Sequence, residues 1–248
     1  MLKLAKSELY RFFRLKFFSL TIIIFAFLIP IVSLIILGVY GNLDASMDVH
    51  VSMTIILNQV IVLLGMPTLL AVYCGTAFNN RMAYYEVMDG NSPVKIIASK
   101  IFSLGMLCSI IAFVPSFIYF LVVDLKNGSG IIENPVMTFV LLFVIFCRVF
   151  VCTILYTLIC KNLVIASLLP YVRFGIIDIV FILVLSSEGL NLDVPDALVD
   201  LFITTQLNKL CQPVYSDKFI AYTVGSALVE IAVLFVLAVI TYKKKKFK

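Results

Sequence analysis

The chain has 248 residues, of which 62% are hydrophobic and 13% charged, and its mean hydropathy is +1.13. This composition excludes a soluble globular domain of the same size. The net charge of +5 is small, and we expect no nucleic-acid partner for so apolar a chain.

Residues 1–17 predict an amphipathic helix that lies at the membrane surface. Apolar side chains recur at steps of three and four residues on one side, and polar or basic side chains occupy the other. The apolar set is Leu2, Ala5, Leu9, Phe12 and Phe13, and the polar set is Lys3, Ser7, Tyr10, Arg11 and Arg14. The alternative is a plain basic flank of the first span, but the spacing favours a helix. The apolar stretch that follows is too long for a signal-peptide core and lacks a small-residue cleavage site, so we interpret it as a retained span.

Six apolar stretches, each long enough to cross a bilayer, determine the fold class. A hydrocarbon core about 30 Å thick requires roughly 20 helical residues. The stretches are residues 18–39, 51–78, 101–123, 136–160, 163–185 and 219–242. They predict an all-α membrane protein with six transmembrane helices. The gaps between them leave no room for another domain, so residues 1–248 are expected to form a single transmembrane domain.

Charged residues between the stretches predict the orientation, because short cytoplasmic loops carry an excess of Lys and Arg. With the N-terminus inside, 14 Lys and Arg residues lie inside and three outside, whereas nine acidic residues lie outside and three inside. We therefore predict a multi-pass plasma-membrane protein with both termini in the cytoplasm. Its basic inner face and its tail, residues 243–248, would contact anionic lipids. The acidic outer face either attracts a cationic molecule or only reflects the retention of Lys and Arg inside.

The loop between the second and third stretches predicts a short exposed helix on the cytoplasmic side. Apolar and polar side chains each recur at helical spacing, the first set being Tyr84, Val87 and Met88 and the second Arg81, Tyr85 and Asp89. Residues 89–93, which read Asp-Gly-Asn-Ser-Pro, predict that this helix ends at Gly90. The next helix would be capped by Asn91 or Ser92, with Pro93 in its first turn. A short, capped, exposed helix has the form of a docking element.

The remaining connections differ in length and character. Only Lys161 and Asn162 join the fourth and fifth stretches, so those two helices must be antiparallel neighbours. The outer segment 186–218 contains apolar runs at residues 197–203 and 207–210. These runs are too short to span, and they predict short re-entrant or interfacial helices at the outer leaflet.

Four charged residues lie within the apolar stretches, namely Arg148, Arg173, Asp178 and Glu230. A charge at the bilayer centre costs roughly 2.5–3.5 kcal/mol, so the four must pair or face a wet cavity. The signs balance, and Arg148 and Arg173 lie at a depth similar to that of Glu230. Two interpretations stay open: salt bridges that hold the last three spans together, or polar groups that line a translocation path or a subunit interface.

The sequence offers little chemistry for catalysis or metal binding. Its one histidine, His50, lies at the end of an outer loop, and five of its six cysteines lie in or at the ends of apolar stretches. Such cysteines behave as small apolar residues. No G-x-x-x-x-G-K-[ST] motif for ATP occurs. We expect no enzyme activity, disulfide, metal or cofactor in this chain, so uphill transport would need an ion gradient or a separate ATPase.

The order of these elements resembles the permease subunit of an ABC transporter of the type 2 exporter class. Residues 86–101, from Glu86 through Gly90 to Ile101, are similar to the family pattern of an acid, a glycine, a helix start and a lysine that opens the third span. The resemblance implies that residues 1–17 are the connecting helix and that residues 186–218 form outer re-entrant helices. It also implies that the cytoplasmic helix couples to an ATPase through Arg81, Tyr84, Tyr85, Glu86, Met88, Asp89 and Gly90.

The same resemblance implies an assembly of two permeases, either identical or paralogous, with two ATPase subunits that bind ATP and Mg. In size the chain is similar to small bacterial permeases for amphipathic peptides, such as those of lantibiotic self-protection and cytolytic-peptide secretion. Two alternatives remain. One is an ion-coupled secondary transporter that uses the intramembrane charges, and the other is a membrane assembly or sensor subunit that transports nothing.

Overall fold

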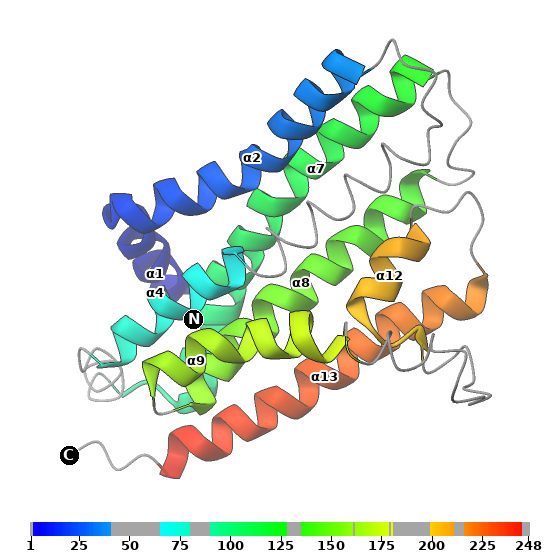
Figure 1. Cartoon of the computed structure of the whole chain (residues 1–248). Helices are drawn as coiled ribbons and strands as arrows, with labels where there is room; N and C mark the ends of the chain where they lie inside the picture. The colour runs from blue at the N-terminus through cyan, green and yellow to red at the C-terminus, as the bar shows by residue number, and fades with distance from the viewer. Residues whose placement is uncertain are drawn as a thin grey trace.

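The computed structural model describes residues 2–40, 65–79, 90–127, 135–160, 162–178, 180, 199–210 and 216–244, which are mostly helical and include no strand (Figure 1). The π-helical turn η2 (Ile101–Gly105) joins α6 to α7, and the π-helical turn η3 (Val172–Ile177) follows α9. The α-helices are α1 (Leu2–Arg14), α2 (Lys16–Tyr40), α4 (Met66–Asn79), α6 (Pro93–Lys100), α7 (Met106–Asn127), α8 (Pro135–Ile159), α9 (Leu163–Tyr171), α12 (Ile203–Leu210) and α13 (Asp217–Lys244).

Three helical segments among the described residues are long and apolar enough to cross a membrane, namely Pro93–Ile118, Val136–Ile159 and Asp217–Lys244. They coincide with the third, fourth and sixth predicted stretches. Shorter apolar helical segments, Lys16–Leu28, Met66–Thr76 and Val164–Ile177, overlap the other three. The chain is therefore an all-helical, membrane-embedded protein, as predicted, and the number of six spans stays a prediction.

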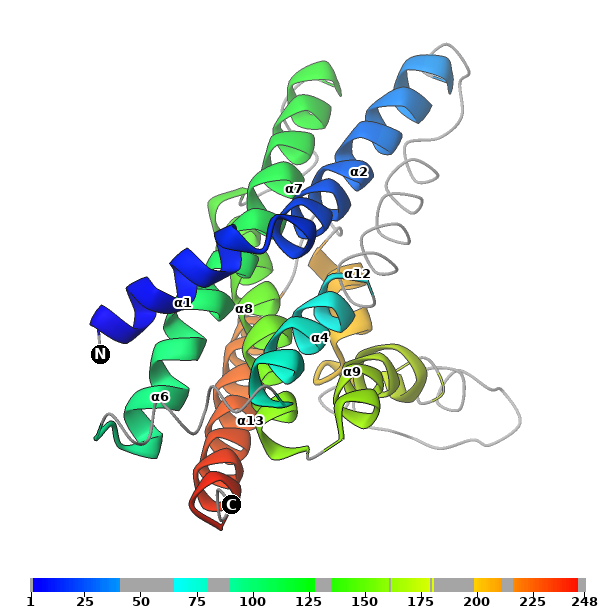
Figure 2. The ribbon, with the colours of Figure 1, turned by 90° about the vertical axis from the view of Figure 1, so that its left-hand side faces the viewer.

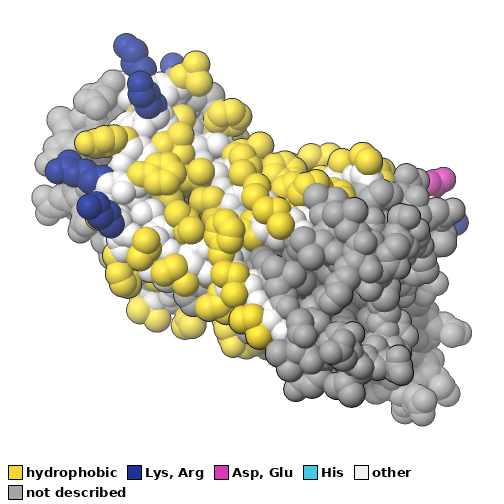
Figure 3. Space-filling model, turned by 90° about the horizontal axis from the view of Figure 1, so that it is seen from above, with side chains coloured by type: hydrophobic (Ala, Val, Ile, Leu, Met, Phe, Trp, Pro, Cys, Tyr) yellow, Lys and Arg dark blue, Asp and Glu magenta, His cyan; other side chains and the backbone are white. Residues whose placement is uncertain are grey.

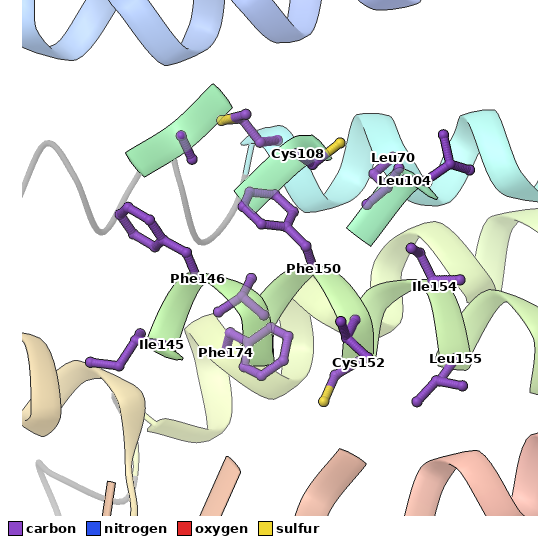
Figure 4. Packing of buried hydrophobic residues seen from close by; sticks show 14 of the residues in the cluster. Leu70, Leu104, Cys108, Ile145, Phe146, Phe150, Cys152, Ile154, Leu155 and Phe174 are labelled. Atoms are coloured by element: carbon purple, nitrogen blue, oxygen red, sulfur yellow. The ribbon is translucent and has the colours of Figure 1, made fainter. Parts of the chain in front are cut away.

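Helix α8 is the centre of the bundle. It packs against α13, α4, α7 and α9, and Figure 2 shows it between α13 and the pair α4 and α9. Its side chains are buried on opposite sides: Phe146 and Phe150 point toward the helix that carries Cys108, whereas Leu155 points toward α13 (Figure 4). An apolar sequence on all faces suits a helix with neighbours all round.

Small residues allow the third span to approach α8 closely. A Cβ atom added at Gly105 would lie 3.1 Å from Cγ2 of Val151. Ser109, Ala112 and Ser116 continue the buried line at steps of four, three and four residues. The two serine hydroxyls donate to carbonyls four residues back, at 2.7 and 3.1 Å. The hydroxyls are thus satisfied within their own helix, and the small side chains let the two backbones pack closely.

Charge and apolar surface are separated along the bundle. Seen from above, Lys and Arg side chains gather at one end of the described surface, and hydrophobic side chains cover the part between that end and the grey residues (Figure 3). α6 packs against both α1 and α13, so the N-terminal helix and the third and sixth spans meet at this basic end. The apolar belt is the surface expected of helices in lipid.

Candidate functional site: a buried charge network

The structure brings all four predicted intramembrane charges into one network. Arg148, on α8, donates to Oε2 of Glu230, on α13, from Nε at 2.7 Å, and its Nη2 lies 2.6 Å from the same oxygen. Arg173, on η3, lies 2.7 Å from Oδ1 of Asp178 and 3.3 Å from Oε1 of Glu230. Two positive and two negative groups thus neutralise one another, as the pairing interpretation predicts.

A π-helical turn makes the Arg173–Asp178 pair possible. The two residues are five apart, and in an α-helix such residues point about 140° away from each other. In η3 the turn is wider, with hydrogen bonds from residue i to i+5, so residues five apart lie above one another. Pro170 precedes this turn in α9 and lacks a backbone N–H, which interrupts the regular ladder.

The network also binds the backbone of the outer segment. Nη1 of Arg148 donates to the carbonyl of Leu201 at 3.2 Å, and the amide of Ile203 donates to Oδ2 of Asp178 at 3.0 Å. Gln206 donates to the carbonyl of Asp200 at 2.8 Å. Irregular backbone is tolerated at membrane depth only where protein groups satisfy it. The charges therefore do more than pair, because they let residues 200–203 turn inside the bundle.

The outer segment differs in detail from the prediction of short helices at residues 197–203 and 207–210. The first run ends in a turn at residues 200–202, and one helix, α12, begins at Ile203 and includes the second run. The polar residues between the runs do not break the helix, because Gln206 faces the network and is buried. The segment reaches Arg148, at mid-length of α8, so it enters the bundle deeply.

Sequence reasoning missed several members of the network. Tyr156 donates to Glu230 at 3.3 Å, and Ser226 accepts from Arg148 at 3.0 Å. Gln206 accepts from Nη1 of Arg148 at 3.3 Å. A signal existed for Tyr156 and Ser226, because they are polar residues in otherwise apolar helices, whereas Gln206 lies in the mostly polar helix α12. Ser226 lies one turn before Glu230 on the same helical face.

Burial is uneven across the four charges. The side chains of Arg148 and Asp178 are 3% and 0% exposed, whereas those of Glu230 and Arg173 are 16% and 24% exposed. Arg148 and Asp178 hold the outer segment, and the Arg173–Glu230 contact lies nearer the bundle surface. The two buried residues, Arg148 and Asp178, thus anchor the segment, and the contact between Arg173 and Glu230 is the more accessible part of the network.

A second cluster joins the N-terminal helix to the bundle at its basic end. Glu8 on α1 forms a buried ion pair with Lys100 at the end of α6, and Arg11 lies 3.6 Å from the other oxygen of Glu8. Phe12 packs edge-on against Tyr73 of α4, with ring centroids 5.4 Å apart. We call these residues the inner clamp.

The inner clamp corrects the predicted face of α1. Ala5, Glu8 and Phe12 are buried, whereas Leu2 and Phe13, assigned to the apolar face, are exposed. The prediction overlooked Glu8 because it is charged, although it lies three residues from Ala5 and four from Phe12. Lys100 supplies the counter-charge that makes its burial possible. α1 also ends at Arg14, and a bend at Leu15 separates it from α2.

The predicted coupling residues are only partly within the described chain. Arg81, Tyr84, Tyr85, Glu86, Met88 and Asp89 lie outside the described residues. Gly90 has a φ of +78°, a conformation that glycine adopts readily and that commonly ends helices. The predicted restart is confirmed: Ser92 caps α6 by accepting from the amide of Lys95, and Pro93 occupies its first turn.

No group of three or more His, Cys, Asp or Glu side chains that could hold a metal occurs within the described ranges. Cys74, Cys108 and Cys152 are buried free thiols in helical segments. Comparison with protein-family models and with curated proteins gives no match. Any functional conclusion therefore depends on the two clusters and on the layout of the chain.

Proposed function

We propose that this chain is the membrane permease subunit of an ATP-driven ABC exporter in a bacterial plasma membrane. It would have six spans, with both termini in the cytoplasm, and would pair with a second permease and two copies of an ATPase. Its substrate would be amphipathic, with antimicrobial or cytolytic peptides as the leading candidates. The order of the helices and the separation of charge along the chain support this proposal.

The observation that carries the proposal is the inner clamp. Glu8 and Lys100 join α1 to α6, and α6 continues through η2 into α7 without leaving helical structure. α6 begins three residues after Gly90, at the end of the segment proposed to couple to the ATPase. A push on residues 81–90 would therefore move α1 and the third span together, as a rigid-body mechanism requires.

A co-purification experiment tests the proposal. The tagged chain is purified from the membranes of its own host in mild detergent, and its partners are identified by mass spectrometry. We expect a P-loop ATPase among them, and we expect the reconstituted complex to hydrolyse ATP and to move peptide. Recovery without any ATPase, together with transport in vesicles that lack nucleotide, would favour the ion-coupled alternative. A recovered ATPase whose activity no substrate stimulates would favour a sensor subunit.

Two variants test the coupling segment within that complex. Glu86→Lys reverses a charge that is proposed to dock, and Gly90→Pro imposes a negative φ where the chain has +78°. Both should leave membrane insertion intact while uncoupling ATP hydrolysis from transport. Asp217→Lys, at the exposed start of α13, is the control for charge reversal on the opposite face. Normal coupling in Glu86→Lys and Gly90→Pro, or labelling of residues 79–95 from outside the cell, would refute the assignment.

A further inference from the structure

Residues 199–210 are held by hydrogen bonds from side chains of neighbouring helices. Asp178, directly after η3, accepts from the amide of Ile203 at 3.0 Å, and the amide of Thr204 interacts with the same carboxylate. Arg148, on α8, donates to the carbonyl of Leu201 at 3.2 Å. These contacts are made to backbone atoms, and the side chain of Gln206 adds a further contact to Arg148.

Such contacts hold the segment reversibly. A protein hydrogen bond has a modest net value because water can replace it, whereas leaving a buried partner unsatisfied is costly. In the docked position Asp178 and Arg148 satisfy the backbone of the segment, and in a withdrawn position water would do so. An intermediate position within the apolar bundle would leave the backbone of residues 201–204 without partners, which favours two discrete states.

The groups that hold the segment belong to different helices. Within the described chain, α13 packs against α8 and η3 packs against α9, whereas η3 and α13 have little contact with each other. The ion pair between Arg173 and Glu230, at 3.3 Å, bridges them. Arg173 also binds Asp178 at 2.7 Å, through the π-helical turn. A shift of α13 relative to η3 would therefore act on Arg173 and, through it, on the carboxylate that holds the segment.

We propose that residues 199–210 form a gate at the outer end of the bundle and that Asp178 is its latch. In the closed state the Asp178 carboxylate binds the start of α12, and in the open state the segment withdraws toward water. The proposal rests on the proposed function only in treating this end as the exit of a transport path. The contacts themselves can be tested without an ATPase and without cargo.

Thiol labelling in intact cells measures the opening. Thr204→Cys is a suitable reporter, because its hydroxyl is buried and makes no hydrogen bond. The background carries Cys211→Ser, and the same chain without the reporter is the blank. A membrane-impermeant maleimide should label the reporter slowly. Asp178→Ala should raise the labelling rate about tenfold, the effect of leaving a buried amide without its acceptor.

Two comparisons separate a latch from simple charge pairing. Asp178→Asn retains an oxygen that can accept from Ile203, so its rate should stay within about threefold of the parent. Ile203→Pro removes the N–H that Asp178 binds, and proline is tolerated at the first position of a helix. Its rate should also rise about tenfold, whereas Ile203→Val, which keeps the N–H, should not change it. Combined with Asp178→Ala, Ile203→Pro should add less than about threefold, because Asp178→Ala already removes the contact between Asp178 and the amide of Ile203.

Three results would overturn the proposal. Equal rates for Asp178→Asn and Asp178→Ala would mean that only the charge matters, and an unchanged rate for Ile203→Pro would remove the contact from the mechanism. Multiplicative effects in the double variant would show that the two residues act separately. Size-exclusion chromatography checks folding, and if Asp178→Ala fails to fold, the comparison of Ile203→Pro with Ile203→Val decides. A failed latch leaves the coupling experiment unaffected, and a missing ATPase leaves the labelling result standing.

Discussion

Replacing Glu230 tests whether the charge network holds the bundle together. Glu230 receives two contacts from Arg148, at 2.6 and 2.7 Å, one from Tyr156 at 3.3 Å and one from Arg173 at 3.3 Å. In Glu230→Leu, the nearly buried guanidinium of Arg148 loses its counter-ion. Removing one member of a buried ion pair costs about 3–5 kcal/mol. Arg148 keeps Leu201 and Ser226 as acceptors, so we expect the lower end of that range.

The conservative and double variants divide this cost into its parts. Glu230→Gln retains one oxygen acceptor and should cost about 1–2 kcal/mol, the value of the charge assistance that it loses. In Arg148→Met with Glu230→Leu, no charge of this pair is left alone. The double variant should therefore lose at least about 2 kcal/mol less than the sum of the two single variants. Its remaining loss reflects the carbonyl of Leu201, which no longer has a donor.

Thermal unfolding in detergent, followed by size-exclusion chromatography, measures these differences. At this chain length 1 kcal/mol corresponds to about 2–4 °C, so Glu230→Leu should lower the Tm by about 6–12 °C. Leu237→Ala, on the exposed face of the same helix, is the control and should change the Tm by no more than about 2 °C. Equal losses in Glu230→Leu and Leu237→Ala, or additivity in the double variant, would refute the pairing argument. Unchanged stability with lost transport would instead support a direct role in the path.

Three further predictions concern other parts of the fold. Glu8→Gln and Lys100→Met should each increase proteolysis of α1 in membrane vesicles. The double variant should be cleaved more slowly than the worse single variant, because it leaves neither charge buried alone. Protection of α1 in all three variants would contradict the inner clamp. Gly105→Leu should lower the Tm by about 2–12 °C through overpacking against α8, whereas Gly225→Ala, with open space at its Cβ, should not lower it. Deleting Ile176 should be tolerated in an expression and folding assay. The π-helical turn would relax to an α-helix in which Arg173 and Asp178 are four residues apart and lie on one face. A loss of folding would show that the wide turn itself is required.

The local features of the fold could be predicted from sequence because local rules decide them. Ser92 and Pro93 start α6 as the cap rules require, and Asn162 caps α9 directly after α8 ends. The pairing of Arg148 and Arg173 with Glu230 was predictable from opposite charge and similar depth. The cost of isolated charge in a membrane leaves few other arrangements.

The contacts of the outer segment could not be predicted, because they involve backbone atoms. Leu201 contributes a carbonyl and Ile203 an amide, and neither side chain signals this role. The π-helical turn was equally hidden, since an i to i+5 pair such as Arg173 and Asp178 appears mismatched on an α-helix. The burial of Glu8 was missed for a different reason: the amphipathic pattern assigned it to neither face, whereas its ion pair with the distant Lys100 places it inside.

The buried charges and the turn of the outer segment within the bundle depend on each other. In a plain helical bundle, replacing a buried ion pair by apolar residues of similar volume is often neutral or stabilising. Here the same replacement should be destabilising, because the turn at residues 200–203 would lose a donor and an acceptor that lipid and apolar side chains cannot supply. A variant without any of the four charges should therefore unfold at a lower temperature than the parent and expose Thr204→Cys to labelling. If it proved as stable as the parent and stayed closed, the segment would need no such partners, and the charges would be retained for transport alone. The variant combines Arg148→Met, Arg173→Met, Asp178→Leu and Glu230→Leu.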